Sequence, residues 1–291
     1  MISIENDDLM ISVNLKGGSL TSIYDKKREK ELLYQPRKES WQGQDVFIFP
    51  FIARIQNQTY THNGNEYHLK NHGLLRYMEG KGEEGKGICS VSFHSDEETL
   101  KQYPFRFEAK ATYELHGKEL VVTYHIRNLS DEDMPYMVGG HPAFMLPGVE
   151  RIDEFDISGN YITFNEKTKL TRITQEETCS FNTGEVEYGI VDRISLSKEM
   201  FRHINTYIFK GEGFKEVKLH KLDGSSLTLK KNDSQYLALW SGNAYGNYIA
   251  IEPWNGIPDY LDSDTEIRSK KGIQILKPLE KTDFSYSIII D

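Results

Sequence analysis

The sequence predicts an all-β protein, and three observations lead to this prediction. The stretch from Phe105 to Leu115 alternates strictly between apolar and polar residues, a period that fits a half-buried strand. Aromatic residues make up 12% of the chain and glycines are plentiful, which favours strands over helices. Shorter strand-like runs recur at intervals of roughly 8–15 residues, close to the spacing of all-β sandwiches and barrels.

The alternating stretch forms the first half of an expected hairpin. Its apolar residues, from Phe105 to Leu115, fall on one face, and its charged residues fall on the other. A turn follows at His116-Gly117, and Glu119 to Leu129 then alternates again. Two alternating stretches joined by a short turn predict a long antiparallel hairpin.

The other expected strands are shorter, and turn pairs such as Gly17-Gly18, Asn63-Gly64 and Asp223-Gly224 separate several of them. In chain order these strands are Leu9–Leu15, Leu20–Tyr24, Ile88–His94, Tyr136–Phe144, Phe155–Phe164, Thr206–Phe209, Glu216–His220, Ser226–Lys230, Tyr236–Ser241, Tyr248–Glu252, Gly272–Leu276 and Phe284–Ile290.

Helix is expected at one place. Ser95 and Glu98 fit a capping box, which would open a short helix that ends near Gln102, before Pro104. No linker, composition shift or repeat of 20–50 residues divides the chain. We therefore expect residues 1–291 to form a single domain.

Charge and cysteine content exclude several classes of protein. The chain has 35 Lys and Arg against 44 Asp and Glu, for a net charge of −9, with no basic block. We therefore expect neither nucleic acid nor a membrane as a partner. Two cysteines, Cys89 and Cys179, exclude a disulfide framework and a four-cysteine zinc site. No apolar run approaches about 18 residues, the first residues do not resemble a signal peptide, and we expect a cytoplasmic protein.

Nucleotide-binding and α/β-hydrolase motifs are absent, and four local clusters carry the candidate chemistry. The first is Phe49–Ile55, where Arg54 stands alone among apolar residues. Burying such an Arg is costly without an anion or polar ligand, and the alternative is an Arg that points to solvent from an edge strand. The second is Lys70–Arg76, where His72 precedes Gly73. A glycine marks close approach of a ligand or of another backbone, and a structural His is the alternative.

The third and fourth clusters supply an acid and a base. His141 follows two glycines and precedes Pro142, and a partly buried imidazole can serve as a general acid near neutral pH. Glu252 ends an apolar strand beside Trp254. Burial raises the pKa of a carboxyl group and makes it a better general base, and the Trp ring offers a flat surface for a sugar. The alternatives are a structural His and a surface Glu.

Taken together and in order, these clusters resemble the aldose 1-epimerase (galactose mutarotase-like) family, and they are most similar to its LacX-like branch. The resemblance covers nearly the whole chain. Its motifs are Gly17–Tyr24, Glu31–Tyr34, Trp41, Phe49-Pro50 with Arg54, His72–Arg76, Thr99 with Tyr103–Phe107, His141–Phe144 and Glu252–Gly256.

The resemblance implies a large antiparallel β-sandwich (a supersandwich) with few short helices and a sugar site in a groove on one sheet. It implies interconversion of the α and β anomers of an aldohexose without a metal or other cofactor. By position, His141 would be the general acid and Glu252 the general base, and Arg54 and His72 would bind the sugar.

Asn205 is a further expected sugar-binding residue. Related enzymes use an Asp to bind a sugar hydroxyl in a segment that aligns with residues 203–209, and this chain has Asn205 there. An amide carries no charge, but it still donates and accepts hydrogen bonds.

Three other functions are compatible with these residues. A hexose-6-phosphate mutarotase would need a basic phosphate site, and beyond Arg54 and Arg76 no cluster of Arg or Lys lies beside the motifs. A sugar-binding or regulatory protein could keep the fold without turnover. A metal enzyme could use two His and one Glu as ligands. If the assignments hold, Arg54, His72, His141 and Glu252 converge on one cleft.

Overall fold

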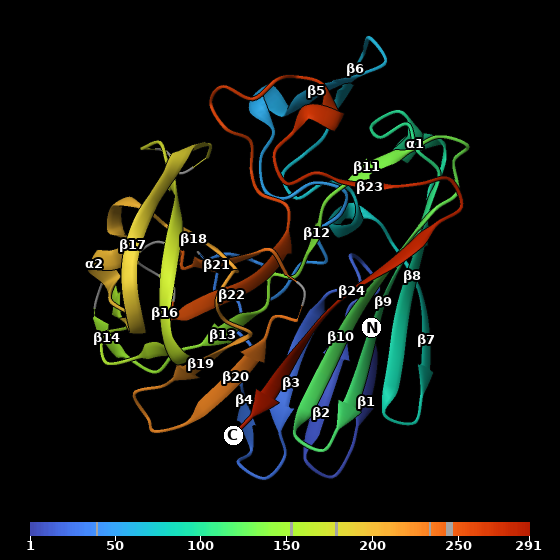
Figure 1. The fold of residues 1–291 in the computed structure, drawn as a ribbon. Helices are drawn as coiled ribbons and strands as arrows, with labels where there is room; N and C mark the ends of the chain where they lie inside the picture. The colour runs from blue at the N-terminus through green and yellow to red at the C-terminus, as the bar shows by residue number, and fades with distance from the viewer. Residues whose placement is uncertain (39, 152–153, 178–179, 233, 243–246) are drawn as a thin grey trace.

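The computed structural model describes residues 1–38, 40–151, 154–177, 180–232, 234–242 and 247–291 (Figure 1). Its architecture is built almost entirely from antiparallel strands, which confirms the predicted all-β sandwich. Cys89 is buried and free, whereas Cys179 lies outside the described residues.

One large antiparallel sheet contains fourteen strands and forms most of the molecule. Along its main path the order is β12 (Val138–Gly139), β22 (Tyr248–Asn255), β21 (Tyr236–Trp240), β18 (Thr206–Lys210), β16 (Tyr161–Gln175), β19 (Glu216–His220), β20 (Ser226–Lys230), β24 (Lys281–Ile290), β10 (Glu119–Asn128), β9 (Phe107–His116), β8 (Ile88–His94) and β7 (Lys81–Gly85). Two further strands lie off this path: β13 (Ala143–Met145) pairs with β22, and β17 (Asn182–Ser195) pairs with β16.

The remaining elements are small. A four-stranded sheet consists of β1 (Ile2–Glu5), β2 (Leu9–Val13), β3 (Leu20–Asp25) and β4 (Lys30–Glu31). Three two-stranded pairs are β5 (Thr59–His62) with β6 (Asn65–His68), β11 (Met134–Tyr136) with β23 (Gln274–Leu276), and β14 (Val149–Arg151) with β15 (Glu154–Asp156). The helical segments are α1 (Glu97–Leu100), α2 (Lys198–His203) and the short 3-10 turns η1 (Gln56–Gln58), η2 (Leu75–Tyr77) and η3 (Ile267–Ser269). None of the helices in the described part of the chain is long and apolar enough to cross a membrane.

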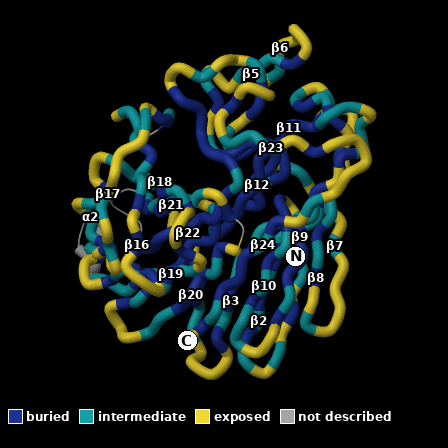
Figure 2. The backbone as a smooth tube through the Cα atoms, in the orientation of Figure 1, coloured by how far each residue is buried: buried dark blue, intermediate teal, exposed yellow. Residues whose placement is uncertain are grey.

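The predicted hairpin is confirmed as β9 and β10. These strands pair in antiparallel register from His116 opposite Glu119 to Phe107 opposite Asn128. The apolar residues of β9 are buried, as are Val122, Tyr124 and Ile126 of β10. Figure 2 shows the contrast with strand β17, most of whose residues are exposed.

The small sheet packs against the large one and closes the sandwich. The hydroxyl of Tyr113 on β9 donates a hydrogen bond to the backbone oxygen of Gly18, just before β3. Gly18 has a positive φ of 58°, and a Cβ there would lie 3.0 Å from the Phe93 ring on β8. A glycine at this position therefore permits both the turn and the close approach of the two sheets.

The helix cap was predicted at the wrong residues. Asp96, not Ser95, is the N-cap of α1, and Thr99 rather than Glu98 completes the capping box. The Ser95 hydroxyl instead accepts a hydrogen bond from the backbone N–H of Phe107. Ser95 is thus tied to strand β9, and the helix begins one residue later.

Several strands also differ from the prediction. The single strand expected over Tyr136–Phe144 is broken into β11, β12 and β13. The strand expected over Phe155–Phe164 is split between β15 and β16, and β16 continues to Gln175. Strand β17 and helix α2 were not predicted. The alternation of Val186, Tyr188 and Ile190 with polar neighbours was the sign of β17, although all three side chains are exposed.

We predict that Tyr113→Phe lowers the free energy of unfolding by about 1–3 kcal/mol, because it leaves the buried Gly18 carbonyl without its donor. Urea unfolding measures the change. Tyr24→Phe is the matched control, because the Tyr24 hydroxyl makes no hydrogen bond within the described residues. Equal stabilities for the two variants would show that the hydrogen bond does not hold the sheets together.

Candidate active site

The register of the large sheet brings His141 opposite Glu252. On one side of His141, Gly139 of β12 pairs with Trp254 of β22. On the other side, Ala143 of β13 pairs with Ala250 of the same strand. Both pairings keep the same register, so the intervening His141 faces Glu252 across a short break in the ladder. Residues 111 positions apart in sequence thereby become cross-strand neighbours.

The two side chains touch and are almost fully buried. Nε2 of His141 lies 3.2 Å from Oε2 of Glu252, and the side chains are 8% and 2% exposed. Burial lowers the pKa of His141 to about 3, with a smaller contribution in the same direction from the charge of Arg76. Burial, followed by the nearby charge of Asp45, raises the pKa of Glu252 well above its ordinary value. The protein thus favours the neutral form of each group.

Asp45 fixes the backbone at this position, and sequence reasoning missed it. One carboxyl oxygen accepts a hydrogen bond from the backbone N–H of His141 (3.1 Å), and the other accepts one from Leu20 (3.2 Å). Burial raises the pKa of Asp45 to about 6, against the opposing effect of these hydrogen bonds. Asp45 therefore ties the catalytic candidate His141 to strand β3 of the small sheet.

The glycines beside the two histidines make room for protein rather than for a ligand. A Cβ on Gly73 would lie 2.3 Å from the backbone oxygen of Phe49. A Cβ on Gly139 would lie 2.5 Å from the Trp254 ring, and one on Gly140 would lie 2.7 Å from Tyr286. Any larger residue at these positions would displace the backbone that carries His72 or His141.

His72 is buried and locked to a neighbouring loop. Its backbone N–H donates to the oxygen of Ala53 (2.9 Å), and its Nδ1 accepts from the N–H of Ala53 (3.2 Å). Burial, and then the charges of His141, Arg76 and Arg54, lower the pKa of His72 well below its ordinary value. The neutral imidazole consequently carries its proton on Nε2, which can donate to a ligand.

Two arginines and one amide lie at the rim. Arg54 is exposed on a loop before η1, not on an edge strand, and its Nη1 donates to Ser180 (2.9 Å). Arg76, which the sequence analysis considered only for the phosphate site of an alternative function, is half-buried. Within the described residues, neither arginine forms an ion pair with a carboxylate. The Asn205 side-chain oxygen accepts from Thr206 (3.0 Å), which leaves its NH₂ group as the available donor.

The aromatic surroundings differ from the sequence expectation. Trp254 is only 2% exposed and packs inside the protein. Trp41 and Trp240 instead flank the His141 ring, with centroids 5.0 and 5.3 Å away. They surround the imidazole with apolar surface, which accounts for its desolvation. Trp41 belonged to the family resemblance without a role, and no local pattern distinguished Trp240.

A cavity of about 320 Å³ unites these side chains, a volume at the lower end of the range for small-molecule sites. All six residues expected from the sequence contribute to its wall: Arg54, His72, His141, Asn205, Glu252 and Trp254. Further wall residues that we did not predict are Trp41, Asn71, Arg76, Gln175, Ser180 and Trp240.

Several buried polar atoms on this wall have no hydrogen-bond partner within the described part of the protein. They are Nδ1 of His141, Oε2 of Glu252, Nε1 of Trp254 and Oδ1 of Asn71. Of these, Oε2 of Glu252 lies 3.2 Å from Nε2 of His141, and the Trp254 N–H acts on the Glu252 carboxyl, where it opposes the rise in pKa caused by burial. Buried polar groups are almost always satisfied in native proteins. Their convergence on one cavity indicates a site built for a polar ligand.

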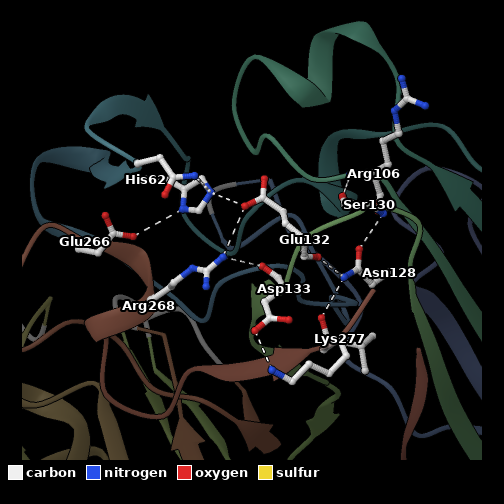
Figure 3. Close-up of polar contacts among 11 residues, drawn as sticks. His62, Arg106, Asn128, Ser130, Glu132, Asp133, Glu266, Arg268 and Lys277 are labelled. Carbon is white, nitrogen blue, oxygen red and sulfur yellow. Dashed lines mark hydrogen bonds and ion pairs between the residues drawn. The ribbon is translucent and has the colours of Figure 1, made fainter. Parts of the chain in front are cut away.

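A second polar cluster lies away from this cavity, at the β5–β6 hairpin (Figure 3). His62 is buried, with Nε2 3.2 Å from Glu132 and Nδ1 3.6 Å from Glu266, and Arg268 reaches the same Glu132 at 3.5 Å. These contacts fasten the hairpin to the neighbouring loops. Across the described ranges, no group of three or more His, Cys, Asp or Glu side chains could hold a metal ion.

Comparisons with known proteins identify the family of the chain. The family described as aldose 1-epimerase matches residues 1–288. The plasmid-encoded protein LacX of Lactococcus lactis subsp. lactis is 28% identical over 308 residues, which span 99% of each chain. An uncharacterized protein, YphB of Escherichia coli, is 28% identical over 160 residues, about half of each chain.

Solved structures show the same fold. A galactose mutarotase related enzyme from Lactobacillus acidophilus has a TM-score of 0.93 and 27% identity, covering 100% of this chain and 97% of that one. A galactose mutarotase-like protein from Lactobacillus casei has a TM-score of 0.92 and 25% identity, covering 100% of both chains.

We predict that Asp45→Asn changes the pH dependence of stability. The pKa of Asp45 is about 6 in the folded protein and near 3.8 in the unfolded chain. At pH values between these two, Asp45 is protonated in the folded state and ionised in the unfolded state. Wild-type stability therefore falls as pH rises through this window, and the variant lacks this loss. The advantage of wild type over the variant should shrink by about 2–3 kcal/mol between pH 4 and pH 7.5.

Urea unfolding at the two pH values measures this difference. Asp131→Asn, at an exposed Asp, is the control, and its difference from wild type should stay constant within about 0.5 kcal/mol. A constant difference for Asp45→Asn as well would mean that Asp45 is not buried in the way described.

Proposed function

The chain belongs to the aldose 1-epimerase family, and from this membership we propose that it is a mutarotase. It interconverts the α and β anomers of an aldohexose by opening and reclosing the ring. The observation that carries this proposal is the direct contact of His141 with Glu252 on the wall of a small polar cavity. An acid and a base this close can exchange protons with the C1 hydroxyl oxygen and the ring oxygen, which are both bonded to C1.

The reaction consists of two linked proton transfers. Glu252 accepts the proton of the C1 hydroxyl while His141 donates a proton to the ring oxygen. The bond from C1 to the ring oxygen breaks, and the C1 carbonyl forms. The open aldehyde rotates about the C1–C2 bond. The ring oxygen then attacks the other face of C1, and the two protons return by the reverse transfers.

The pair can catalyse the reaction because His141 and Glu252 together hold one proton that can move between them. Burial disfavours an imidazolium next to a carboxylate, which keeps both groups neutral in the absence of sugar. Hydrogen bonds to a charged form stabilise that form. A ring oxygen that accepts from His141 and a C1 hydroxyl that donates to Glu252 supply these bonds. Sugar binding therefore moves this proton from Glu252 to His141, which gives the carboxylate and the imidazolium that ring opening requires.

The other cavity residues bind and orient the sugar. His72 Nε2 and the Asn205 amide donate hydrogen bonds to hydroxyls, and Arg54 and Arg76 place positive charge near the oxygens. Trp41 and Trp240 exclude water from the imidazole. Trp254 supplies its indole N–H rather than a ring face. Proton transfer and positioning together are sufficient, so we propose no cofactor.

We predict that Glu252→Gln and His141→Gln each reduce the enzymatic rate of mutarotation by about 10²–10⁴-fold, because each removes one proton-transfer group. Polarimetry with freshly dissolved α-D-glucose and α-D-galactose measures the rate after subtraction of the spontaneous reaction. His94→Gln, at an exposed His, should retain wild-type activity.

The result distinguishes a mutarotase from a carbohydrate-binding protein of the same fold. A protein that binds these sugars by calorimetry, accelerates no mutarotation above buffer and is unaffected by Glu252→Gln would be a binding protein, and the enzymatic proposal would fail.

We also predict an acid-tolerant pH profile. Because the pKa of His141 is about 3, the pair gains a second, inhibitory proton only near that pH. In the Asp45→Asn variant, which removes the titration of Asp45 near pH 6, the value of kcat/KM should change by less than about twofold between pH 5 and pH 7. At higher pH it should fall as the raised pKa of Glu252 is passed and the shared proton is lost. A tenfold loss of activity from pH 7 to pH 5, with the fold intact by circular dichroism, would contradict this assignment.

A further inference from the structure

A second cavity adjoins the active-site cavity. Its volume is about 250 Å³, and it shares Trp41, Val46 and Arg76 with the first. Asp45 also lines the second cavity while its carboxyl oxygen accepts the backbone N–H of His141. The two cavities are therefore neighbours, and Asp45 links the wall of the second cavity to the backbone of His141.

Neutral hydrogen-bonding side chains dominate the wall of this second cavity. They are Asn14, Ser19, Thr21, Gln42 and Gln44. The side chains of Ser19 and Gln44 make no hydrogen bond with any described residue, so they are available to a ligand. Hydroxyls and amides that donate and accept, beside an aromatic ring, are suited to the hydroxyls and apolar faces of a sugar.

We propose that the second cavity binds the non-reducing unit of a disaccharide, whose reducing unit lies at His141 and Glu252. This inference rests on the proposed mutarotase activity and extends it to the substrate class. The two cavities have similar volumes and share part of their lining. Two linked sugar rings of equal size would fit adjacent spaces of this kind. Trp41 belongs to the shared lining and presents surface to both.

Charge favours a neutral second unit over a phosphate. The cations at this cavity are Lys16, which is exposed, and Arg76. The carboxyl group of Asp45 faces the same space, and Glu79 lies opposite Lys16 in a β-bridge. A phosphate site needs converging, uncompensated cations or backbone N–H groups. Asp45 and Glu79 place carboxyl groups near these two cations without forming an ion pair with either, and the cations come from separate segments.

The test compares substrates that share a reducing glucose. Mutarotation is measured for glucose, maltose, isomaltose and glucose 6-phosphate, so that differences report only the substituent. We expect kcat/KM for maltose or isomaltose to exceed that for glucose by about tenfold. The two linkages sample different directions from the reducing ring into the second cavity. Equal values for glucose and both disaccharides would overturn the proposal, as would a preference for glucose 6-phosphate that Lys16→Gln removes.

Two variants test whether the disaccharide preference arises from the second cavity. Gln44→Ala removes a free amide, and Thr21→Phe fills the space. Each should reduce the disaccharide-to-glucose ratio of kcat/KM, and Thr21→Phe should bring it to about one. Gln102→Ala, which truncates the same side chain outside both cavities, should keep the wild-type ratio. A wild-type ratio in both cavity variants would show that disaccharides do not use this space.

The outcome separates this inference from the proposed function. Acceleration of glucose mutarotation without any disaccharide preference refutes the second subsite alone. If no sugar is turned over, the mutarotase proposal fails, and calorimetric binding then tests the subsite. Maltose or isomaltose bound about tenfold more tightly than glucose, with the difference lost in Thr21→Phe, would support it. Equal binding would refute it.

Discussion

The contact between the His141 imidazole and the Glu252 carboxyl is the constraint that the rest of the site must satisfy. Two titratable groups 3.2 Å apart and almost fully buried are costly to place in a protein interior unless they remain neutral or pair. The pairing of strands in the large sheet holds the two groups in contact. Strand β22 is held at both ends by β12 and β13 in one register, which leaves the two side chains no route to solvent except the cavity.

Two further buried carboxyl groups hold the walls of the cavity. Asp45 joins His141 to the small sheet through backbone hydrogen bonds. Behind the wall residues Arg54 and Pro258, Asp259 forms a fully buried ion pair with Lys270 at 2.7 Å, and its backbone N–H donates to the oxygen of Arg54. A buried ion pair contributes specificity of position more than net stability. The site thus depends on the contact between the two sheets and not only on β22.

The sequence predicts the scaffold better than the surroundings of the catalytic pair. Alternation over β9 and β10 is a strong local pattern because one face of each strand is buried. Strand β17 carries a similar alternation with both faces exposed, which local reasoning does not expect. His141 and Glu252 were identified through short motifs and a family resemblance. Asp45 acts through long-range backbone contacts, and no residue near it in sequence indicates that role.

Local charge in the cavity differs in sign from the charge of the whole chain. The net charge is −9, yet Arg54 and Arg76 face the cavity without a carboxylate partner among the residues described. The cavity acid, Glu252, is kept protonated by burial, so it does not cancel them. As a C1 hydroxyl loses its proton, negative charge develops on that oxygen, and fixed positive charge in a dry site stabilises it. Burial keeps His72 and His141 neutral, and the charge of Arg76 acts in the same direction. The arginines therefore favour the negative charge that ring opening creates, whereas protonation of His141 depends on the hydrogen bonds that bound sugar supplies.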